Sequence, residues 1–202
     1  NHMDIIDVNL VYSDFHKKFI SDNSKTVVIP FPVDTELFYP RGIKKDDFVW
    51  CGRIAPEKRI IDLAVMFEDN VNSNLTVIGG PDNKAWVEDI KHSDLEKVSF
   101  VGRKFDESLA EELAKHKYFV LPSKYETYCL AVLEALASGC SVYATYYEGL
   151  EWAKDYITFA EDLEELIELV KNPTHKDYSQ SIVENFSWDV LKPKYLDLLM
   201  SD

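Results

Sequence analysis

The sequence predicts an α/β fold built on a doubly wound parallel sheet, and three observations lead to this prediction. Short apolar runs rich in Val, Ile, Phe and Tyr alternate with segments of helical periodicity, most regularly from about residue 26 to residue 143. Several of these runs are continuously apolar, as in strands that a parallel sheet buries on both faces. A β-α-β-α order also implies right-handed crossovers, which carry helices onto the two faces of the sheet.

Seven apolar runs are predicted to be strands: residues 8–12, 26–29, 48–51, 75–78, 98–101, 118–121 and 141–143. Eight segments with helical patterns accompany them: residues 13–21, 58–68, 84–91, 107–115, 128–138, 162–171, 176–184 and 188–200. In the sixth helix, Leu163, Leu166, Ile167 and Val170 recur at i, i+3, i+4 and i+7, so one side of it is apolar. Pro193 lies inside the last helix and predicts a kink or a late start. From residue 162 onward the pattern is that of a helical C-terminal tail.

Three segments define the expected domain organisation. Residues 30–41 contain three prolines, which neither a helix nor a central strand tolerates, and are the expected linker. Asn1-His2-Met3 resembles an expression-vector scar, and the strand and helix before the linker look like the remnant of a preceding domain. We therefore expect residues 1–25 to be scar and remnant, and residues 26–202 to form one domain of ordinary size.

The charge and composition exclude several classes of protein. With 36 acidic and 22 basic residues, a formal net charge of −14, the chain is not expected to bind nucleic acid or an anionic membrane. A small anionic ligand stays open, because a local pocket can oppose the overall charge. Three cysteines without C-x-x-C spacing favour the reducing cytoplasm as the location. No apolar run approaches the ~20 residues of a membrane span.

Several cofactor and catalytic motifs are absent from the sequence. The seven glycines never take the G-x-G-x-x-G spacing, and there is no P-loop, G-x-S-x-G or H-E-x-x-H motif. No two aspartates stand at i and i+2, and the histidines and cysteines do not have metal-ligand spacing. We therefore expect neither a cofactor nor a metal.

The first candidate site follows the strand at residues 48–51. Residues 51–60 hold three basic side chains and one acidic side chain. In an open α/β sheet, ligands bind beyond the carboxyl ends of the strands, where loops lead into helix N-termini that favour anions. Arg53 and Lys58 can then converge on a phosphate. The ordinary alternative is a solvated helix start with surface charges.

The second candidate site follows the strand at residues 118–121. Within the helix that comes next, Glu134 is the only polar residue between Leu130 and Ala137. A buried carboxylate without donors costs on the order of several kcal/mol, so Glu134 needs donors such as ribose hydroxyls. Glu126 lies eight residues earlier, at the helix entrance, where free amides can bind a phosphate. The ordinary alternative for Glu134 is a core carboxylate bound to a lysine or to backbone amides.

Two glycine turns complete the same edge of the predicted sheet. Gly79-Gly80 follows the strand at residues 75–78, and Gly102-Arg103 follows the strand at residues 98–101. Glycine in such a turn lets a flat ligand approach the backbone closely. Each turn, taken alone, also fits an ordinary connection between a strand and a helix.

In order along the chain, these segments resemble the motifs of the group-1 (family 4) retaining glycosyltransferases, which use nucleotide sugars. The matches are residues 27–40 with the linker IPNGVD…F.P, residues 52–58 with GR…PEK(G), residues 75–81 with L.IVG.GP, residues 98–102 with V.FLG, residues 126–134 with E-x7-E, and residues 186–188 with FSW. The resemblance covers about residues 26–200. It implies a Rossmann-like, donor-binding carboxyl-terminal domain, one half of the two-domain GT-B architecture.

The resemblance also implies a role for each matching residue. Arg53 and Lys58 would hold the donor diphosphate and offset its charge as it departs, in place of a metal. Glu126 would contact the transferred hexose and would complete the catalytic set with Arg53 and Lys58. Glu134 would bind the ribose hydroxyls of the donor nucleotide. The other expected donor contacts are made mainly by backbone groups. Gly52 is one of them, Gly102 and Arg103 would meet the base, and Cys129 and Leu130 would approach the phosphate or the sugar.

Three departures from the family motifs are visible. Cys129 stands where E-x-[FY]-G-L has glycine, and Phe31-Pro32 stands where the linker usually has Asn-Gly. Gly149 is the single glycine of a segment that resembles the late GG.PE loop.

The implied function is transfer of a hexose from a nucleoside-diphosphate sugar to an acceptor, with retention and without a metal, in glycan or polysaccharide biosynthesis. The partners would be the donor and an amino-terminal domain that supplies the acceptor site and any membrane contact. We therefore expect the isolated chain to bind donor and transfer nothing. Two alternatives stay open: a non-catalytic nucleotide-sugar-binding subunit with a separate amino-terminal partner chain, and a GT-B relative such as a nucleotide-sugar epimerase.

Overall fold

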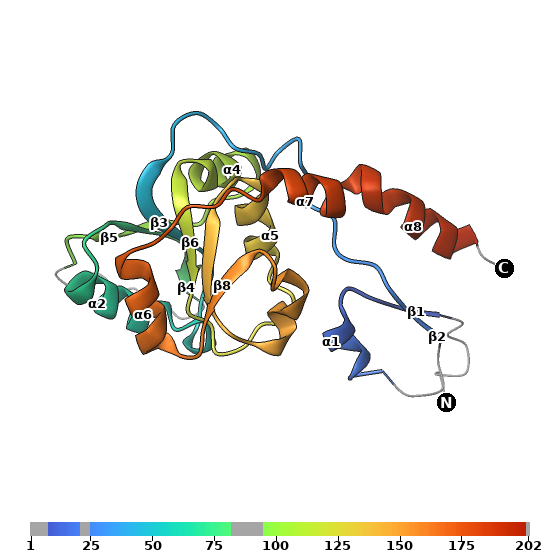
Figure 1. Cartoon of the computed structure of the whole chain (residues 1–202), viewed down its shortest axis with the longest axis horizontal. Helices are drawn as coiled ribbons and strands as arrows, with labels where there is room; N and C mark the ends of the chain where they lie inside the picture. Colours follow the sequence, from blue (N-terminus) through green and yellow to red (C-terminus); the bar gives the residue numbers. More distant parts are fainter. Residues whose placement is uncertain (1–7, 21–24, 82–94, 201–202) are drawn as a thin grey trace.

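The computed structural model describes residues 8–20, 25–81 and 95–200. At its centre is a six-stranded parallel sheet in the order β5-β4-β3-β6-β7-β8 (Figure 1). Its strands are β3 (Lys45–Ile54), β4 (Leu75–Pro81), β5 (Val98–Gly102), β6 (His116–Leu121), β7 (Ser141–Thr145) and β8 (Ile157–Ala160). The first strand of this sheet lies in the middle and the chain winds outward from it in both directions. This is the doubly wound, Rossmann-like order, so the predicted fold class is confirmed.

Helices cover both faces of the sheet. On one face, α2 (Ile60–Asn70) packs against α6 (Leu163–Lys171), and on the other α5 (Leu130–Ala137) contacts both α4 (Asp106–Ala114) and α7 (Ser179–Phe186) (Figure 1). The last helix, α8 (Trp188–Met200), continues from α7 and extends beyond the sheet, which confirms the helical C-terminal tail.

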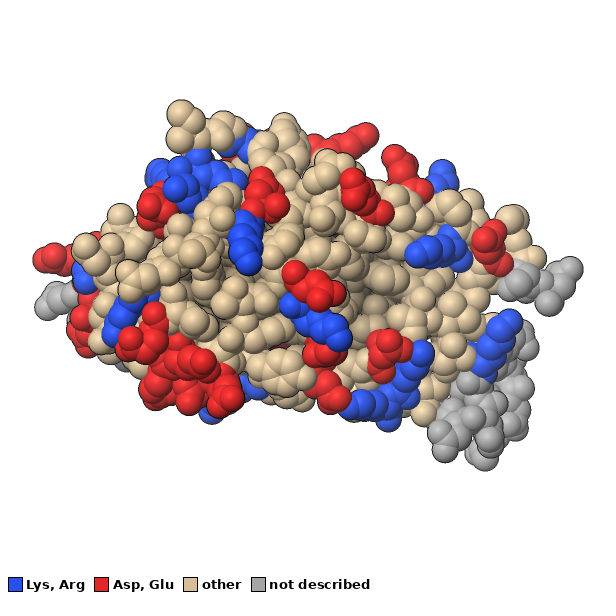
Figure 2. Space-filling view, viewed as in Figure 1, with Lys and Arg blue, Asp and Glu red and all other residues tan. Residues whose placement is uncertain are grey.

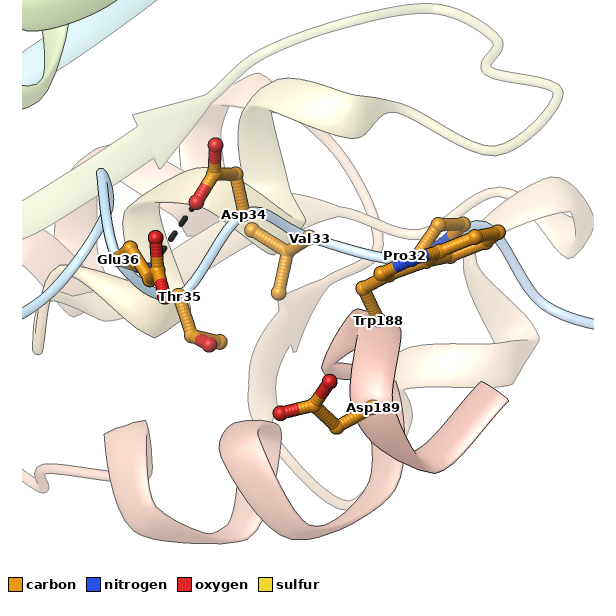
Figure 3. Close-up of a pocket in the computed structure, with 7 residues that line it drawn as sticks. All are labelled: Pro32, Val33, Asp34, Thr35, Glu36, Trp188 and Asp189. Carbon is orange, nitrogen blue, oxygen red and sulfur yellow. Dashed lines mark hydrogen bonds between the residues drawn. The ribbon is translucent and has the colours of Figure 1, made fainter. Parts of the chain in front are cut away.

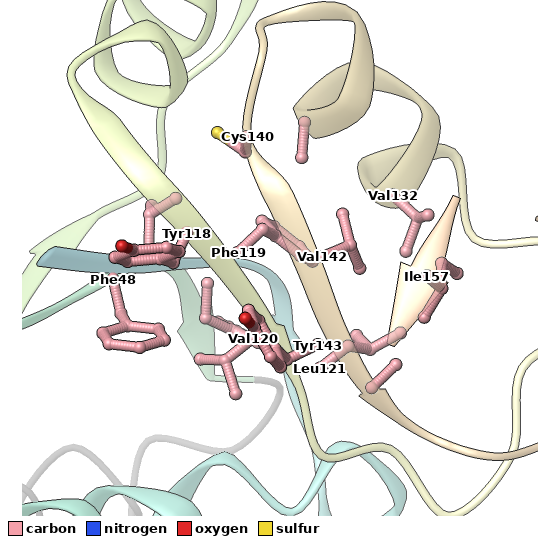
Figure 4. Close-up of a cluster of buried hydrophobic side chains, with 14 of the residues drawn as sticks. Phe48, Tyr118, Phe119, Val120, Leu121, Val132, Cys140, Val142, Tyr143 and Ile157 are labelled. Atoms are coloured by element: carbon pink, nitrogen blue, oxygen red, sulfur yellow. The ribbon is translucent and has the colours of Figure 1, made fainter. Parts of the chain in front are cut away.

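The hydrophobic core lies on both faces of the central strands. Phe48, Val49 and Trp50 are consecutive in β3 and each is at most 1% exposed, which is possible only where both sides of a strand are covered. Figure 4 shows how side chains of β3, β6 and β7 fill the same space as Val132 of α5. The apolar side of α6 is buried as predicted. Its acidic side faces solvent, and Figure 2 shows acidic side chains gathered on that part of the surface.

The N-terminal elements form a unit of their own beside the main sheet. Strands β1 (Val8–Val11) and β2 (Lys25–Val28) make a separate two-stranded parallel sheet, so β2 does not join the six-stranded one. Between them α1 (Asp14–Lys17) is a single turn, much shorter than the helix predicted for residues 13–21. It lies against η3 (Glu148–Ala153). Lys18, which follows α1, forms an ion pair with Glu148 of η3. The domain boundary expected between residues 25 and 26 stays a prediction.

The proline-rich segment, residues 30–41, connects this unit to the sheet without helix or strand, as its prolines require. The amide of Val33 donates to the carbonyl of Phe186 at 2.8 Å, and Val33 and Ser187 form an isolated parallel bridge. A cavity of about 450 Å³ lies between this segment and the start of α8, with Trp188 over Pro32 and Asp189 on the opposite side from Val33 (Figure 3).

Besides α1, three elements differ clearly from the prediction: β8 and η3, which were not predicted, and α2, which begins later than predicted. Strand β8 and the short helix η3 were missed, because four residues between polar turns carry little periodicity. Helix α2 begins at Ile60 rather than at Lys58, since Arg59 has a left-handed backbone (φ +49°) and separates it from the 3₁₀ turn η2 (Pro56–Lys58). Helix α8 begins at Trp188, so Pro193 does not delay its start and instead lies within its second turn. The helix predicted for residues 84–91 lies outside the described residues.

Candidate active site

The candidate site lies at the carboxyl ends of β3 and β6, the two neighbouring strands from which the chain winds in opposite directions. This switch point is where open α/β sheets bind ligands, because the loops after the two strands diverge and leave a crevice. Arg53 is the second-to-last residue of β3, Lys58 lies in η2 (Pro56–Lys58), which follows that strand, and Glu126 lies on the loop after β6. Of the three residues that the family resemblance assigned to catalysis, the structure brings Lys58 and Glu126 into contact.

An ion pair joins the two loops. The ammonium of Lys58, on η2, lies 2.7 Å from Glu126 Oε1, and the hydroxyl of Ser123 donates to the same oxygen at 2.7 Å. The Glu126 side chain is 7% exposed. The backbone is tied as well, since the amide of Lys124 donates to the carbonyl of Glu57 at 2.8 Å. The surface-charge alternative therefore fails for Lys58.

Arg53 takes a different position. Its guanidinium donates to Glu57 Oε1 at 2.6 Å and its side chain is 56% exposed. It leaves the ion pair to Lys58 and instead borders a cavity on the side of β4.

This cavity, which we call the cationic cavity, has a volume of about 390 Å³ and is lined by Cys51, Gly52, Arg53, Ile78, Gly79, Gly80, Arg103, Lys104, Phe105 and Leu109. Among these lining residues three are basic and none is acidic, in a chain of net charge −14. Arg53 is paired with Glu57 and Lys104 is paired with Glu112 at 2.9 Å, so the local positive potential that a small anion needs comes mainly from Arg103. Gly102 does not line it and only turns the chain, with φ +78°.

The glycines of the cationic cavity permit close packing. A Cβ on Gly79 would lie 2.0 Å from the carbonyl oxygen of Gly52, its partner in the β3–β4 register. A Cβ on Gly80 would lie 2.6 Å from Arg103 Nε, so the Arg103 side chain crosses directly over that glycine. The two glycines lie at the end of β4 rather than in a turn after it. Gly79 is required by the close approach of the Gly52 carbonyl, whereas the flexible Arg103 side chain could move away from a Cβ on Gly80.

Glu134 projects from α5 and is half-buried. Burial raises the pKa of its carboxyl group to about 7, and no described residue donates a hydrogen bond to it or pairs with it. Burial, and then the charge of Glu134, raise the pKa of the Cys51 thiol, on β3, to about 12. A core carboxylate bound to a lysine or to amides is therefore not what the structure shows. The carboxylate has capacity for donors from a ligand.

Two positions adopt backbone angles that favour glycine. Cys129 has φ +63° directly before Leu130 begins α5, and Arg59 has φ +49° directly before α2. The family motifs have glycine at both positions, so the backbone keeps the same turn with larger side chains. Such residues each cost on the order of 1–3 kcal/mol. Burial, and then the nearby Glu126, raise the pKa of the Cys129 thiol, which therefore stays protonated.

Three further residues, which the sequence did not assign to the site, hold the Glu126 loop. Besides Ser123, the hydroxyl of Thr145 donates to the carbonyl of Ser123 at 2.6 Å. Gly149 of η3 lies so close that its Cβ would be 1.8 Å from the carbonyl oxygen of Glu126. The sequence does mark Gly149, as the lone glycine of the late loop, although only the structure shows what it contacts.

The described residues contain no group of three or more His, Cys, Asp or Glu arranged to hold a metal ion. Within the same ranges, no helix has the length and apolarity needed to cross a bilayer.

The fold is similar to that of solved glycosyltransferases. Sucrose-phosphate synthase from Thermosynechococcus elongatus superposes with a TM-score of 0.78 at 22% identity, over 95% of this chain and 57% of that one. Anabaena Alr3699/HepE, solved in complex with UDP and glucose, superposes with a TM-score of 0.73 at 16% identity, over 91% of this chain and 60% of that one. The architecture is that of one Rossmann-like half of the GT-B class.

At the level of sequence, the family model described as "Glycosyl transferases group 1" matches residues 45–172, more than half of the chain. The chain therefore belongs to the group 1 glycosyl transferases. It is 33% identical over 93 residues to a GDP-mannose-dependent alpha-mannosyltransferase of Mycobacterium tuberculosis, an alignment that spans 46% of this chain and 23% of that protein. The chain thus matches only part of the length of its relatives.

Proposed function

We propose that this chain is the donor-binding half of a retaining glycosyltransferase that transfers a hexose from a nucleoside-diphosphate sugar without a metal. The observation that carries the proposal is the Lys58–Glu126 pair at the switch point, beside a cavity lined by three basic residues and no described acid. A cation next to a carboxylate at this position fits a donor that presents a diphosphate and a sugar side by side.

Each group has a chemical task in this proposal. Lys58 and Arg53 offset the two negative charges of the diphosphate, and they stabilise the charge that develops as the nucleotide departs. Glu126, already oriented by Ser123, accepts hydrogen bonds from hydroxyls of the hexose. Glu134, which lacks described donors, accepts the ribose hydroxyls. The base enters the cationic cavity at Gly52 and Arg103, with Gly102 turning the chain directly before Arg103, and the amides of Cys129 and Leu130 face the phosphate or the sugar.

Related proteins support a nucleotide-sugar donor. The mycobacterial relative is named as GDP-mannose-dependent, and the Anabaena structure contains UDP and glucose. These two donors differ in base and in sugar, so the proposal here is the nucleoside-diphosphate hexose class. The acceptor would be bound by an amino-terminal domain of the same chain or of a partner chain. The three free cysteines agree with the reducing cytoplasm as the site of action.

Isothermal titration calorimetry with UDP, GDP, ADP and their hexose conjugates tests the proposal. We expect at least one nucleotide to bind, with an affinity that EDTA does not change. Lys58→Ala and Glu134→Ala should weaken this binding far more than Glu161→Ala, whose side chain lies on the exposed acidic surface. No binding at millimolar concentration, or equal losses in all three variants, would show that the donor site is misassigned.

A protein that also contains the acceptor domain separates the three candidate functions. Product analysis should detect a glycosylated acceptor for the transferase and an isomerised nucleotide sugar for an epimerase. A non-catalytic subunit would bind the nucleotide sugar and leave it unchanged until its partner chain is added.

A further inference from the structure

A second cavity, of about 340 Å³, lies beside the catalytic loops and shares no lining residue with the cationic cavity. It is lined by Ile54, Ala55, Pro56, Arg59, Ile60, Ile61, Asp62 and Lys124. We propose that this cavity, here called the isoleucine cavity, binds a phosphate monoester that carries a short apolar chain. The proposal goes beyond the proposed function, because it assigns a ligand to a site that the donor does not use.

The wall of the isoleucine cavity is mainly apolar. Ile54 and Ile60 are 3% and 1% exposed and belong to the core, whereas Ile61 is 37% exposed on the first turn of α2. Ala55 and Pro56 complete this apolar wall. A purely ionic ligand would leave this surface in contact with water, so an apolar segment is favoured in the ligand.

Two cations stand at the same cavity. Arg59 is half-buried and its Nε donates to the carbonyl of Pro122 at 2.8 Å, which fixes the guanidinium against the second wall. Lys124 is exposed, and no described residue forms a hydrogen bond or an ion pair with its ammonium. Asp62 is the only acid among the described lining residues, so the lining carries a net positive charge. Cations of this kind next to an apolar wall complement a phosphate with an apolar chain.

The backbone at Arg59 supports a role for its side chain. The left-handed angle there would suit glycine, which the family motif has, yet this chain places a long cation at that position. The guanidinium of Arg59 is therefore the group that this strained position contributes to the isoleucine cavity.

The site adjoins the Lys58–Glu126 pair. Its two walls are joined by the hydrogen bond from the Lys124 amide to the Glu57 carbonyl. Glu57 immediately precedes Lys58, and Lys124 is two residues before Glu126. A ligand in the isoleucine cavity would therefore bind both loops that carry the pair.

Binding of a chain-length series to the protein without nucleotide tests this inference. The probes are inorganic phosphate, butyl phosphate and hexyl phosphate, with hexanol as the uncharged control, measured by calorimetry or by NMR titration. Because each buried methylene adds to the apolar area removed from water, we expect hexyl phosphate to bind at least tenfold more tightly than inorganic phosphate, and hexanol to bind weakly.

Variants identify the cavity. Lys124→Gln should weaken hexyl phosphate binding about fivefold or more, and Ile61→Ser should remove most of the dependence on chain length. Arg59→Gly should weaken binding while raising the melting temperature, because it removes the cation and relieves the backbone. Lys192→Gln, an exposed lysine of α8 without a described partner, is the matched control and should bind as the parent does.

Three results would overturn the inference: affinity independent of chain length, affinity unchanged in Lys124→Gln and Arg59→Gly, or complete displacement of hexyl phosphate by a nucleoside diphosphate. The last result would place the ligand in the cationic cavity. If no nucleotide binds at all, the proposed function fails while the chain-length series still decides on the isoleucine cavity.

Discussion

The ammonium of Lys58 and the carboxylate of Glu126 lie 2.7 Å apart, although 68 residues separate them along the chain. Their contact closes the crevice between β3 and β6, because each residue stands on the loop that leaves one of these two strands. The same pair therefore links the two loops in the free protein, and it is the pair to which we assign donor binding in the proposed function.

Breaking this pair should destabilise the protein. Removal of one partner leaves the other charge largely buried, so Lys58→Met or Glu126→Gln should each lower the free energy of unfolding by about 2–4 kcal/mol, slightly less than for a fully buried pair. The double variant should recover part of the loss, as urea denaturation can measure. The exposed pair of Lys171 and Glu168 is the control, since Lys171→Met should cost less than about 1 kcal/mol. Additive losses in the double variant would contradict the coupling.

Glu134 should make stability depend on pH. Burial raises its pKa from an ordinary 4.5 to about 7 in the folded protein, so the folded state holds a proton that the unfolded state has released between these values. Stability is therefore lost as the pH rises from about 4.5 to 7, by up to about 3 kcal/mol.

Glu134→Gln cannot lose this proton and should escape the effect. Denaturation at pH 5 and at pH 8 should show similar stability of the variant and the parent at pH 5, and a more stable variant at pH 8. Parallel pH profiles of the two proteins would show that the carboxyl group titrates normally.

The left-handed backbone at Cys129 predicts that glycine is better accommodated there. Cys129→Gly should raise the free energy of unfolding relative to Cys129→Ala by about 1 kcal/mol, because both remove the thiol and only glycine relieves φ +63°. Comparison of the two melting temperatures measures the strain. If alanine were equal to or better than glycine, the turn would not be strained.

Gly149 should tolerate no side chain. Gly149→Ala places a Cβ 1.8 Å from the carbonyl oxygen of Glu126, a backbone atom that cannot move without shifting the loop. We expect a loss of about 1–3 kcal/mol in stability together with weaker nucleotide binding. Gly42→Ala is the control for backbone strain without a clash, since Gly42 has φ +59° and no atom within 4 Å of its Cβ, whereas Gly149 has no positive φ. Equal effects at the two positions would show that the contact with the Glu126 carbonyl is not the cause of the loss.

The sequence predicts the sheet and the edge at which the site lies, because buried parallel strands such as Phe48–Cys51 are continuously apolar and the motifs follow them directly. It does not predict the pairing of Lys58 with Glu126, which depends on β3 and β6 being neighbours in space. It also requires donors for Glu134, and the structure shows none among the described residues. The break at Arg59 has no local signal in its residue type, and the glycine at position 149 does not by itself show that the Glu126 carbonyl lies against it.

The bridge between Val33 and Ser187 brings the two ends of the six-stranded unit to one point. Nearby, the hydroxyl of Tyr195 donates to the carbonyl of Pro30 at 2.9 Å and reinforces this junction. Residues 33–187 thus form a unit whose first and last residues lie next to each other. Units with adjacent termini tolerate circular permutation and insertion into another protein. Joining residues 33 and 187 through a short peptide, with new ends opened in an exposed turn, would give a compact scaffold for engineering the site.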